Sequence, residues 1–445
     1  MQASREQEIQ EVGRRLVAAL PSAARHPVKA AGDRALDLAS SDRELRAALL
    51  RFVDVAPACR SLDDLAAHLV GFLGDVHDHS HALDAAIRIG DSRIGRAALG
   101  SAAAAGVRHV AHRFIVAETP AEAERVLRSL WHDGVATSVD LLGEATVTAA
   151  EADRYAARCA GALGALTALY AKLPPAPALE ADSIGPIPRV NLSVKVSALT
   201  PLLRPESPEL GERDAAPRLR ALLRAARDLG AHLHVDMESF DSREAIAELT
   251  LALLAEEEFR DGPSAGLVLQ AYLLDSPELC ERIVAWATCT ARAVPLVVRL
   301  VKGAYWDHEV VEARQHGWRP PVFEIKADCD RNFEALTVRL LQARPYVRPA
   351  IASHNLRSIA HAIVANRETG ADAGDLELQV LRGLGDELQH ALAREGHRVR
   401  TYCPVGDLVA GMAYLVRRLL ENTSNESFLV ERAGGRPLEE LLAAP

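Results

Sequence analysis

Two adjacent arginines and a nearby glutamate stand out in the segment YLVRRLLEN, close to the C-terminal end of the sequence. If this segment is a helix, Arg417 and Glu421 lie four residues apart and Arg418 and Glu421 three apart, so the pairs can meet on its surface. Guanidinium groups bind a carboxylate through two parallel hydrogen bonds. With Lys195 as a third cation, these arginines predict a site for a small carboxylate.

Carboxylates accompany these cations in the sequence. Glu144 and Asp236 follow predicted strands, and with Glu421 they could hold the cations in place. A ligand that carries both a carboxylate and a cationic nitrogen would suit such a mixture of charges. The residue types therefore predict an amino-acid site.

Polar residues also follow the ends of most predicted strands. Any one of them could form a structural ion pair, but together they indicate one reactive mouth. These residues are Asp140 and Glu144, Lys195 and Ser197, Asp236 and Glu238, Gln270, Arg299 and Lys302, Ser353, His354 and Asn355, and Tyr402.

The segment VVRLVKGAYWD has the composition of a cofactor-binding strand end. Gly303 permits close approach of the backbone, and Tyr305 and Trp306 supply flat apolar faces. This composition suits a planar cofactor. No G-x-G-x-x-G motif follows a strand, so a Rossmann cofactor domain is not expected.

The elements that position these residues alternate between short β-branched runs and longer amphipathic segments. This alternation predicts an α/β protein with a (β/α)8 TIM-like barrel, whose reactive residues lie at the carboxyl ends of the strands. The predicted strands cover 135–142, 189–199, 231–238, 266–272, 295–303, 347–355, 376–381 and 398–403, and the predicted helices cover 151–172, 216–229, 241–258, 276–293, 324–343, 356–369, 384–396 and 408–421. The Pro- and Gly-rich segment 172–188 is expected to be a surface excursion.

We expect three parts along the chain of 445 residues: an N-terminal helical arm (1–106), the barrel (107–428) and a C-terminal linker or tail (429–445). The formal charge of −10 offers no basic field for nucleic acid, so we expect no nucleic-acid partner. Six scattered cysteines and a polar N-terminus predict a cytoplasmic location.

Histidines do not indicate a metal site. His77 and His81 lie four residues apart, but no third and fourth ligand is evident, so we expect no metal. His232 and His234 share one face of a predicted strand and are expected to be hydrogen-bonded groups inside the barrel.

The motifs between Gly134 and Phe428 resemble the proline dehydrogenase domain of bifunctional proline utilization A (PutA) proteins. Weaker similarity extends through the helical arm. The motifs that carry the resemblance are DLLGEA (140–145), NLSVKVSAL (191–199), HVDMESF (234–240), VLQAY (268–272), VRLVKGAYWD (298–307), SHN (353–355), YCPVGDL (402–408) and YLVRRLLENTSNESF (414–428).

This resemblance implies a barrel that binds FAD and oxidises L-proline to Δ1-pyrroline-5-carboxylate, with hydride transfer to flavin N5 and electrons passing to a quinone at the membrane. The implied substrate and catalytic residues are Lys195, Arg417 and Arg418 at the carboxylate, Asp236 near the amine, Tyr305 and Tyr402 along the ring, and Glu144 and Glu421 bracing the arginines. The implied cofactor residues are Met237 through its backbone, Gln270, Arg299, Lys302, Gly303, Ala304, Trp306, Ser353, His354 and Asn355. Arg299 is also implied to act in catalysis, beside flavin N5.

The resemblance further implies a pyrroline-5-carboxylate (aldehyde) dehydrogenase partner, as a second half of the enzyme or as a separate chain, and peripheral membrane association during turnover. Tyr402 predicts preference for proline over 4-hydroxyproline. The helical arm suggests a homodimer. Two alternatives stay open at this point: a noncatalytic barrel scaffold, and a flavin-free lyase or aldolase that uses Lys195 or Lys302 as a Schiff-base nucleophile.

Overall fold

The computed structural model describes residues 2–21, 43–77, 84, 87–88, 93–407, 411, 414 and 436–445. Within these ranges, eight strands form a closed barrel in the order β1-β10-β9-β8-β7-β6-β5-β4. Each neighbouring pair is parallel. The predicted (β/α)8 barrel with an N-terminal helical region is confirmed.

All eight predicted barrel strands are present. They are β1 (Val135–Leu141), β4 (Asn191–Val194), β5 (His232–Val235), β6 (Ser264–Gln270), β7 (Leu296–Val301), β8 (Val347–Ala352), β9 (Glu377–Leu381) and β10 (Arg398–Val405). Almost every strand residue is buried, because helices cover the outside of the barrel and side chains fill its interior.

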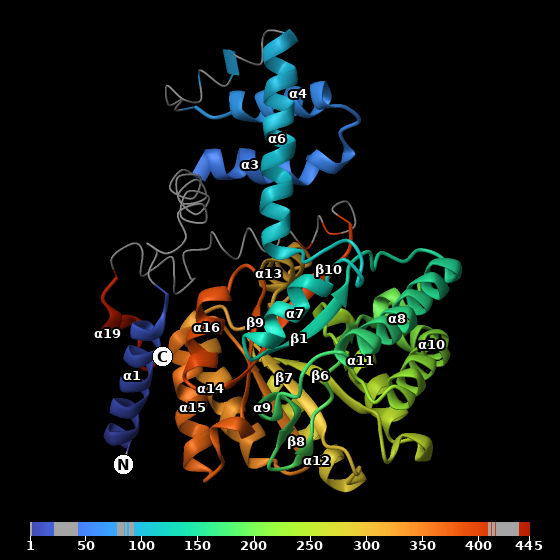
Figure 1. Cartoon of the computed structure of the whole chain (residues 1–445), viewed down its shortest axis with the longest axis vertical. Coiled ribbons are helices and arrows are strands. Elements are labelled where there is room, and N and C mark those ends of the chain that lie inside the picture. Colours follow the sequence, from blue (N-terminus) through green and yellow to red (C-terminus); the bar gives the residue numbers. More distant parts are fainter. Residues whose placement is uncertain are drawn as a thin grey trace.

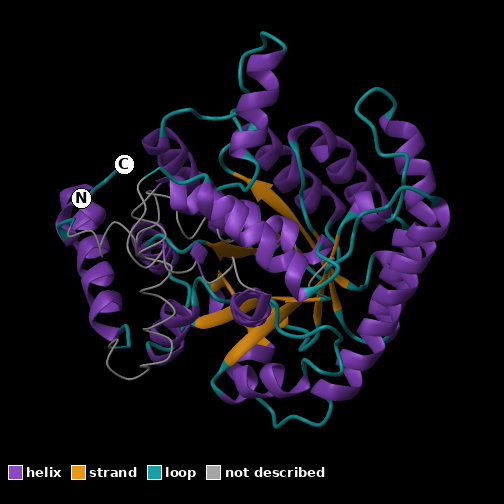
Figure 2. Cartoon of the chain, turned by 90° about the horizontal axis from the view of Figure 1, so that it is seen from above, coloured by secondary structure: helices purple, strands orange, loops and turns teal. Residues whose placement is uncertain are grey.

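A ring of helices surrounds the strands (Figure 2). Its members are α8 (Ala149–Tyr170), α10 (Pro208–Asp228), α11 (Phe240–Leu254), α12 (Ser276–Thr290), α14 (Lys326–Gln342), α15 (Leu356–Glu368) and α16 (Asp386–Arg394). Two further helices, α7 (Glu124–His132) before β1 and α13 (Trp306–Gln315) after β7, were not predicted. The eighth predicted helix, 408–421, lies outside the described residues apart from positions 411 and 414.

Three helices form a separate body at one end of the barrel: α3 (Arg43–Val55), α4 (Leu62–Gly74) and α6 (Arg93–Phe114) (Figure 1). They share a small apolar core that includes Phe52, Leu69 and Val107. Helix α6 runs from this body to the barrel, where Arg113 Nε donates to the carbonyl of Gly383, 3.1 Å away, just beyond β9. The arm therefore joins the barrel at the carboxyl ends of its strands.

The first helix, α1 (Gln2–Ala19), lies apart from that body, on the flank of the barrel against α15 and α16 (Figure 1). The C-terminal helix α19 (Leu438–Leu441) packs beside it. A Cβ at Gly13 would lie 2.5 Å from a methyl carbon of the buried Leu442, so a larger residue there would require the Leu442 side chain to move. The proposed limits of the arm, barrel and tail stay predictions.

The segment 172–188 folds under the amino ends of the strands. It contains α9 (Pro177–Glu180) and the hairpin of β2 (Ala181–Asp182) and β3 (Gly185–Pro186). The Asp182 side chain is 0% exposed and accepts hydrogen bonds of 2.8 and 2.9 Å from Arg348. Most of this segment lies at the surface, as predicted, but the Asp182 side chain turns inward and pairs with arginines inside the barrel.

No helix in the described ranges is both long enough and apolar enough to cross a bilayer.

Candidate active site

A largely enclosed lysine lies among three carboxylates at the carboxyl end of the barrel. Lys195 directly follows β4, and its Nζ lies 3.0 Å from both carboxylate oxygens of Asp140, near the end of β1. The same Nζ lies 3.8 Å from Glu144 Oε1 and 3.8 Å from Asp236 Oδ2. These four charged groups come from the ends of three strands, β1, β4 and β5, and lie close together at the mouth of the barrel.

Burial changes the protonation of this cluster. It raises the pKa of Asp140 to about 6; Lys195 counteracts the rise, and Asp236 and Glu144 add to it. Burial alone would lower the pKa of Lys195, but the surrounding carboxylates raise it well above its ordinary value. Lys195 is therefore a firmly protonated cation at neutral pH.

Arg299, on β7, is the second cation of the site and is only 4% exposed. Its Nη1 donates to Asp236 Oδ1 at 2.7 Å and its Nε donates to Gln379 Oε1 at 2.7 Å. Its Nη2 lies 3.2 Å from Ser138 Oγ and 3.3 Å from Ser193 Oγ. These contacts from four different strands hold the guanidinium in one orientation.

Tyr402, on β10, completes this cluster. Its hydroxyl donates to Asp236 Oδ2 at 2.6 Å, and its ring lies 5.3 Å from the Arg299 guanidinium carbon. Burial raises the pKa of Tyr402 well above its ordinary value, and the carboxylates of Asp140 and Asp236 raise it further. The phenol therefore stays protonated and donates.

The structure thus brings together four of the residues expected at the substrate, Lys195, Glu144, Asp236 and Tyr402, with Arg299, which was expected in catalysis and at the cofactor. Asp140 lies at the centre of this group; the sequence placed it at a strand end but gave it no role. Arg417, Arg418 and Glu421 lie outside the described residues.

The residues expected at the cofactor form three smaller groups. In the first, Gln270 at the end of β6 donates from Nε2 to the carbonyl of Glu238 at 2.9 Å, next to the buried Met237. Burial raises the pKa of Glu238, whose carboxylate accepts from the backbone and side chain of Ser197. Gln270 Oε1 is buried and has no hydrogen-bond partner among the described residues, so it can accept from an N–H of a bound group.

The second group follows β7. Gly303 has φ of +143°, and a Cβ there would lie 2.3 Å from the Tyr272 ring, so this close approach requires glycine. Lys302 pairs with Asp330 of α14. Trp306 is 39% exposed and its indole N–H donates to the carbonyl of Phe323. Tyr305, at the N-cap of α13, is half-buried, and Ala304 beside it is exposed.

The third group lies between β8 and α15, directly before the first turn of that helix. Asn355 caps this helix, since its Oδ1 accepts from the backbone N–H of Ser358 at 3.1 Å. Ser353 Oγ accepts from the N–H of Asn355. His354 Nε2 accepts from the N–H of Leu381 at 2.9 Å, which places the proton of the neutral ring on Nδ1.

The interior histidines lie below the cluster. His232 contacts Ser264 Oγ at 2.8 Å through Nδ1 and His234 at 3.1 Å through Nε2, whereas His234 Nε2 has no partner among the described residues. Burial lowers the pKa of His232 to about 3, and nearby Arg400 lowers it further. The expectation of a hydrogen-bonded interior group is thus met at His232 and only partly at His234.

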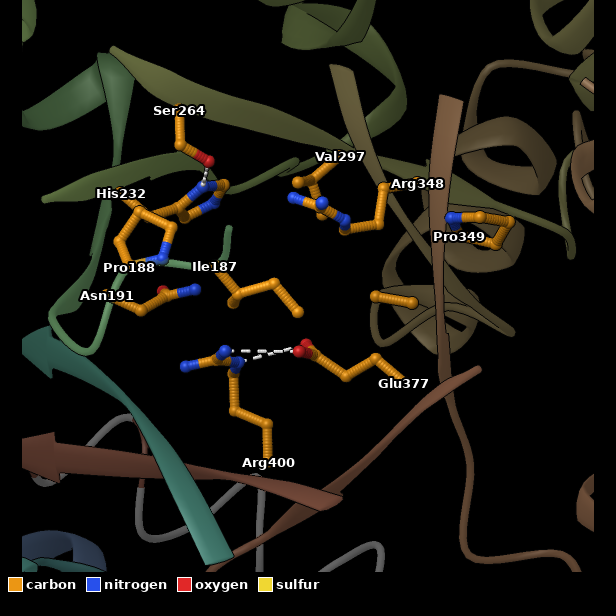
Figure 3. Close-up of a pocket in the computed structure, with 11 residues that line it drawn as sticks. Ile187, Pro188, Asn191, His232, Ser264, Val297, Arg348, Pro349, Glu377 and Arg400 are labelled. Carbon is orange, nitrogen blue, oxygen red and sulfur yellow. Dashed lines mark hydrogen bonds and ion pairs between the residues drawn. The ribbon is translucent and has the colours of Figure 1, made fainter. Parts of the chain in front are cut away.

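A small cavity lies at the opposite, amino end of the barrel (Figure 3). Arg400 and Glu377 face one another across it, with His232 and Ser264 on another wall. Arg400 donates to both oxygens of Glu377, at 2.9 and 3.0 Å. Because these charges are paired with each other and lie far from the strand ends, this cavity is part of the structural core.

Two family models match the chain and together cover most of it. Residues 123–431 match the proline dehydrogenase model. The chain belongs to the proline dehydrogenase family. Residues 6–114 match the N-terminal domain of proline utilization A, which includes α1 and the arm helices.

Individual relatives agree with this family. The chain is 32% identical over 347 residues to the bifunctional protein PutA of Escherichia coli (strain K12), covering 76% of this chain and 25% of that protein. It is 28% identical over 330 residues to proline dehydrogenase 1 of Bacillus subtilis (strain 168), covering 74% of this chain and 92% of that protein.

A solved structure agrees as well. The crystal structure of proline utilization A from Bdellovibrio bacteriovorus, inactivated by N-propargylglycine, aligns with a TM-score of 0.89 at 32% identity and covers 100% of this chain and 44% of that chain. The chain thus spans about a quarter of the length of the curated bifunctional relatives and less than half of this structural relative.

Proposed function

We propose that this member of the proline dehydrogenase family oxidises L-proline to Δ1-pyrroline-5-carboxylate with FAD as the hydride acceptor. The observation that carries the proposal is the cluster of Lys195, Asp140, Asp236, Arg299 and Tyr402 at the carboxyl end of a barrel of this family. In such barrels the reaction takes place at that end.

The charges of the cluster suit an amino acid. Two cations, Lys195 and Arg299, face three carboxylates, Asp140, Glu144 and Asp236. The surplus carboxylate favours the cationic amine of proline, and the Lys195 ammonium favours its carboxylate. Arg417 and Arg418 are proposed to complete the carboxylate site, with Glu421 and Glu144 beside them, and Tyr305 to contact the ring.

The geometry explains how the chain could promote the reaction. The amine must first lose one proton to water, because hydride loss needs the nitrogen lone pair; loss of hydride from the ring carbon next to nitrogen then leaves a C=N bond that carries one positive charge. Asp236 is held by Arg299 and Tyr402, so a fixed carboxylate can stabilise that charge. Lys195 orients the substrate through its carboxylate, which holds the reacting C–H in place.

The described residues fit a flavin. The unpartnered Gln270 Oε1 can accept from a ring N–H, Lys302 can pair with a phosphate, Trp306 offers an exposed aromatic face, and the first turn of α15 offers backbone N–H groups. FAD would supply the acceptor for the hydride. We propose Met237, Arg299, Gly303, Ala304, Ser353, His354 and Asn355 as its remaining contacts.

The Schiff-base alternative is less consistent with these contacts. A nucleophilic lysine must be neutral, but Lys195 is surrounded by carboxylates that raise its pKa well above the ordinary value. Lys302 is ion-paired with Asp330, which is also paired with Lys326 at 2.6 Å. The scaffold alternative predicts a protein without stoichiometric FAD.

The proposal also includes an electron acceptor and partner proteins. We propose a quinone at the membrane as the electron acceptor, with peripheral membrane contact by an otherwise cytoplasmic protein. We also propose a pyrroline-5-carboxylate dehydrogenase that consumes the product. The arm helices are proposed to support a homodimer, which light scattering after size exclusion would test.

The deciding experiment is the visible absorbance spectrum of the purified protein before and after anaerobic addition of L-proline. Flavin bands that bleach with proline are expected. A colourless protein that FAD cannot reconstitute would refute the proposal.

In the same assay, proline should be used with higher kcat/KM than 4-hydroxyproline, because Tyr402 is expected to crowd the ring. Equal values would contradict that preference.

A further inference from the structure

Gln379 connects Arg299 to the ion pairs at the amino end of the barrel. It lies on β9, is 4% exposed and points into the barrel interior. Its Oε1 accepts from Arg299 Nε at 2.7 Å, and its Nε2 donates to Glu377 Oε1 at 2.7 Å. Glu377 is two residues earlier on the same strand, so both side chains lie on the same face.

The orientation of this amide is fixed by the chemistry of its neighbours. A guanidinium only donates hydrogen bonds, so it must face the amide oxygen. An ionised carboxylate only accepts, so it must face the amide nitrogen. A flipped amide of Gln379 would bring donor against donor at Arg299 and acceptor against acceptor at Glu377.

Glu377 is in turn held ionised and immobile. Arg400 binds both of its oxygens, at 2.9 and 3.0 Å, and Arg398 Nε lies 3.6 Å from Oε2. Burial alone would raise the pKa of Glu377, but Arg400 and Arg398 hold it well below its ordinary value. The carboxylate therefore stays ionised, and so an acceptor, at neutral pH.

We propose that Gln379 is a positioning residue for the oxidation: it fixes the plane of the Arg299 guanidinium, and through it the Asp236 carboxylate. This inference rests on the proposed function for its kinetic consequence. Gln379 itself need not touch substrate. Its effect reaches the reaction through the bonds from Gln379 to Arg299 and from Arg299 to Asp236, each 2.7 Å long.

The first test replaces the amide by an apolar side chain of similar length, Gln379→Met. We expect proline to bleach the flavin about tenfold more slowly at saturating proline, with KM changed less than about twofold, because Arg299 loses one charge-assisted bond. The flavin reduction potential should also shift. Gln389→Met is the matched control. Gln389 lies on α16, is as buried as Gln379 and accepts a hydrogen bond from Thr401 on β10 instead of one from Arg299.

A second readout needs neither flavin nor proline. In the flavin-free protein, the Hε–Nε NMR signal of Arg299, assigned by its loss in Arg299→Lys, should be protected from solvent exchange. Protection should disappear in Gln379→Met and persist in Gln389→Met. An unchanged signal together with an unchanged bleaching rate in Gln379→Met would overturn the proposal.

The variant Gln379→Glu keeps the size of the side chain and tests the same point if the methionine variant does not fold. Protonated, its acid group can still donate to Glu377 and accept from Arg299; ionised, it repels Glu377. We therefore expect kcat to fall as the pH rises through the pKa of the introduced carboxyl group, an ionisation that the wild type lacks. The charged or titratable groups facing this position are Glu377 on β9, Arg299 on β7, Arg398 and Arg400 on β10, and His232 and His234 on β5.

A pH profile of Gln379→Glu identical to that of the wild type would also count against the proposal. These outcomes are separate from failure of the proposed function. If wild-type flavin does not bleach with proline, the reaction is wrong, but the NMR comparison still tests whether Gln379 fixes Arg299.

Discussion

Among the described residues, the two ends of the barrel interior both contain buried ion pairs, but their excess charges have opposite signs. At the amino end, Arg348, Arg398 and Arg400 face the two carboxylates of Asp182 and Glu377. At the carboxyl end, Lys195 and Arg299 face the three carboxylates of Asp140, Glu144 and Asp236.

Among the described residues, backbone groups satisfy most of the excess at the amino end, although Arg398 Nε stays buried without a hydrogen-bond partner. The surplus guanidinium donors at the amino end bond backbone carbonyls, such as those of Gly185 and Thr137. At the carboxyl end, Glu144 Oε2 is buried without a hydrogen-bond partner among the described residues. An ion network that backbone carbonyls largely complete serves the fold, whereas an excess of carboxylates is suited to cationic groups, whether of a ligand or of Arg417 and Arg418, which are proposed to lie beside Glu144.

The largest effect is expected at the amino end, from Asp182→Ala. Removing this carboxylate leaves Arg348 and Arg398 buried without their partner, so the free energy of unfolding should fall by about 3–5 kcal/mol. Urea denaturation measures the loss. The fraction that remains folded should bleach with proline at the wild-type rate; a small loss of stability would break the contrast between the two ends.

The converse effect is expected from Lys195→Met at the carboxyl end. We expect kcat/KM for proline to fall about 100-fold, because the substrate carboxylate loses a charged partner. Stability should change much less than in Asp182→Ala, because Asp140, with a pKa of about 6, can take up a proton when Lys195 is lost. Steady-state kinetics and urea denaturation on the same sample provide the comparison.

A smaller effect is expected from Tyr402→Phe. The change removes the 2.6 Å hydrogen bond to Asp236 and keeps the ring beside Arg299. We expect about a tenfold lower kcat, from the loss of one hydrogen bond to a charged group. Phe substitution of the buried Tyr170, whose hydroxyl contacts Thr137 outside this cluster, is the control and should leave kcat unchanged.

The pH dependence of stability should also differ between the two ends. The folded pKa of His232, about 3, lies below its ordinary value, so the unfolded chain binds the extra proton and stability falls as pH decreases from about 6.5. The folded pKa of Asp140, about 6, lies above its ordinary value, so stability falls as pH increases from about 4 to 6.

Thermal unfolding from pH 4 to 7 checks this difference. Each proton contributes a slope of at most about 1.4 kcal/mol per pH unit. His232→Asn should flatten the acid side of the profile, and Asp140→Asn should remove the opposing slope. If both variants changed the profile in the same direction, the two ends would not differ as described.

Much of the fold and of the cluster at the carboxyl end was visible in the sequence. The barrel followed from eight β-branched runs, because parallel strands buried on both faces are almost continuously apolar. The polar residues at the strand ends identified Lys195, Asp236 and Arg299, since all parallel strands of a barrel end at the same mouth. The resemblance to a family supplied the roles that residue types alone left open.

The rest depended on pairings between residues distant in the sequence. The sequence placed Asp140 at a strand end, but only the structure shows that Lys195, which was expected to bind a ligand, also donates to Asp140. Gln379 looked like any polar residue on a strand. Asp182 lay in a Pro- and Gly-rich turn, where a carboxylate is normally solvated; its arginine partners are 166 and 216 positions away.

The β2–β3 hairpin under the amino ends of the strands has a consequence for exchange with solvent. Because this hairpin and its arginines lie across the amino end, we expect substrate to enter at the opposite, carboxyl end of the strands. Substrate arrival and product departure must then use the same opening, next to the point where α6 joins the barrel at Gly383. Residues at that rim would control both rates together, so a change there that slows entry should slow release as well.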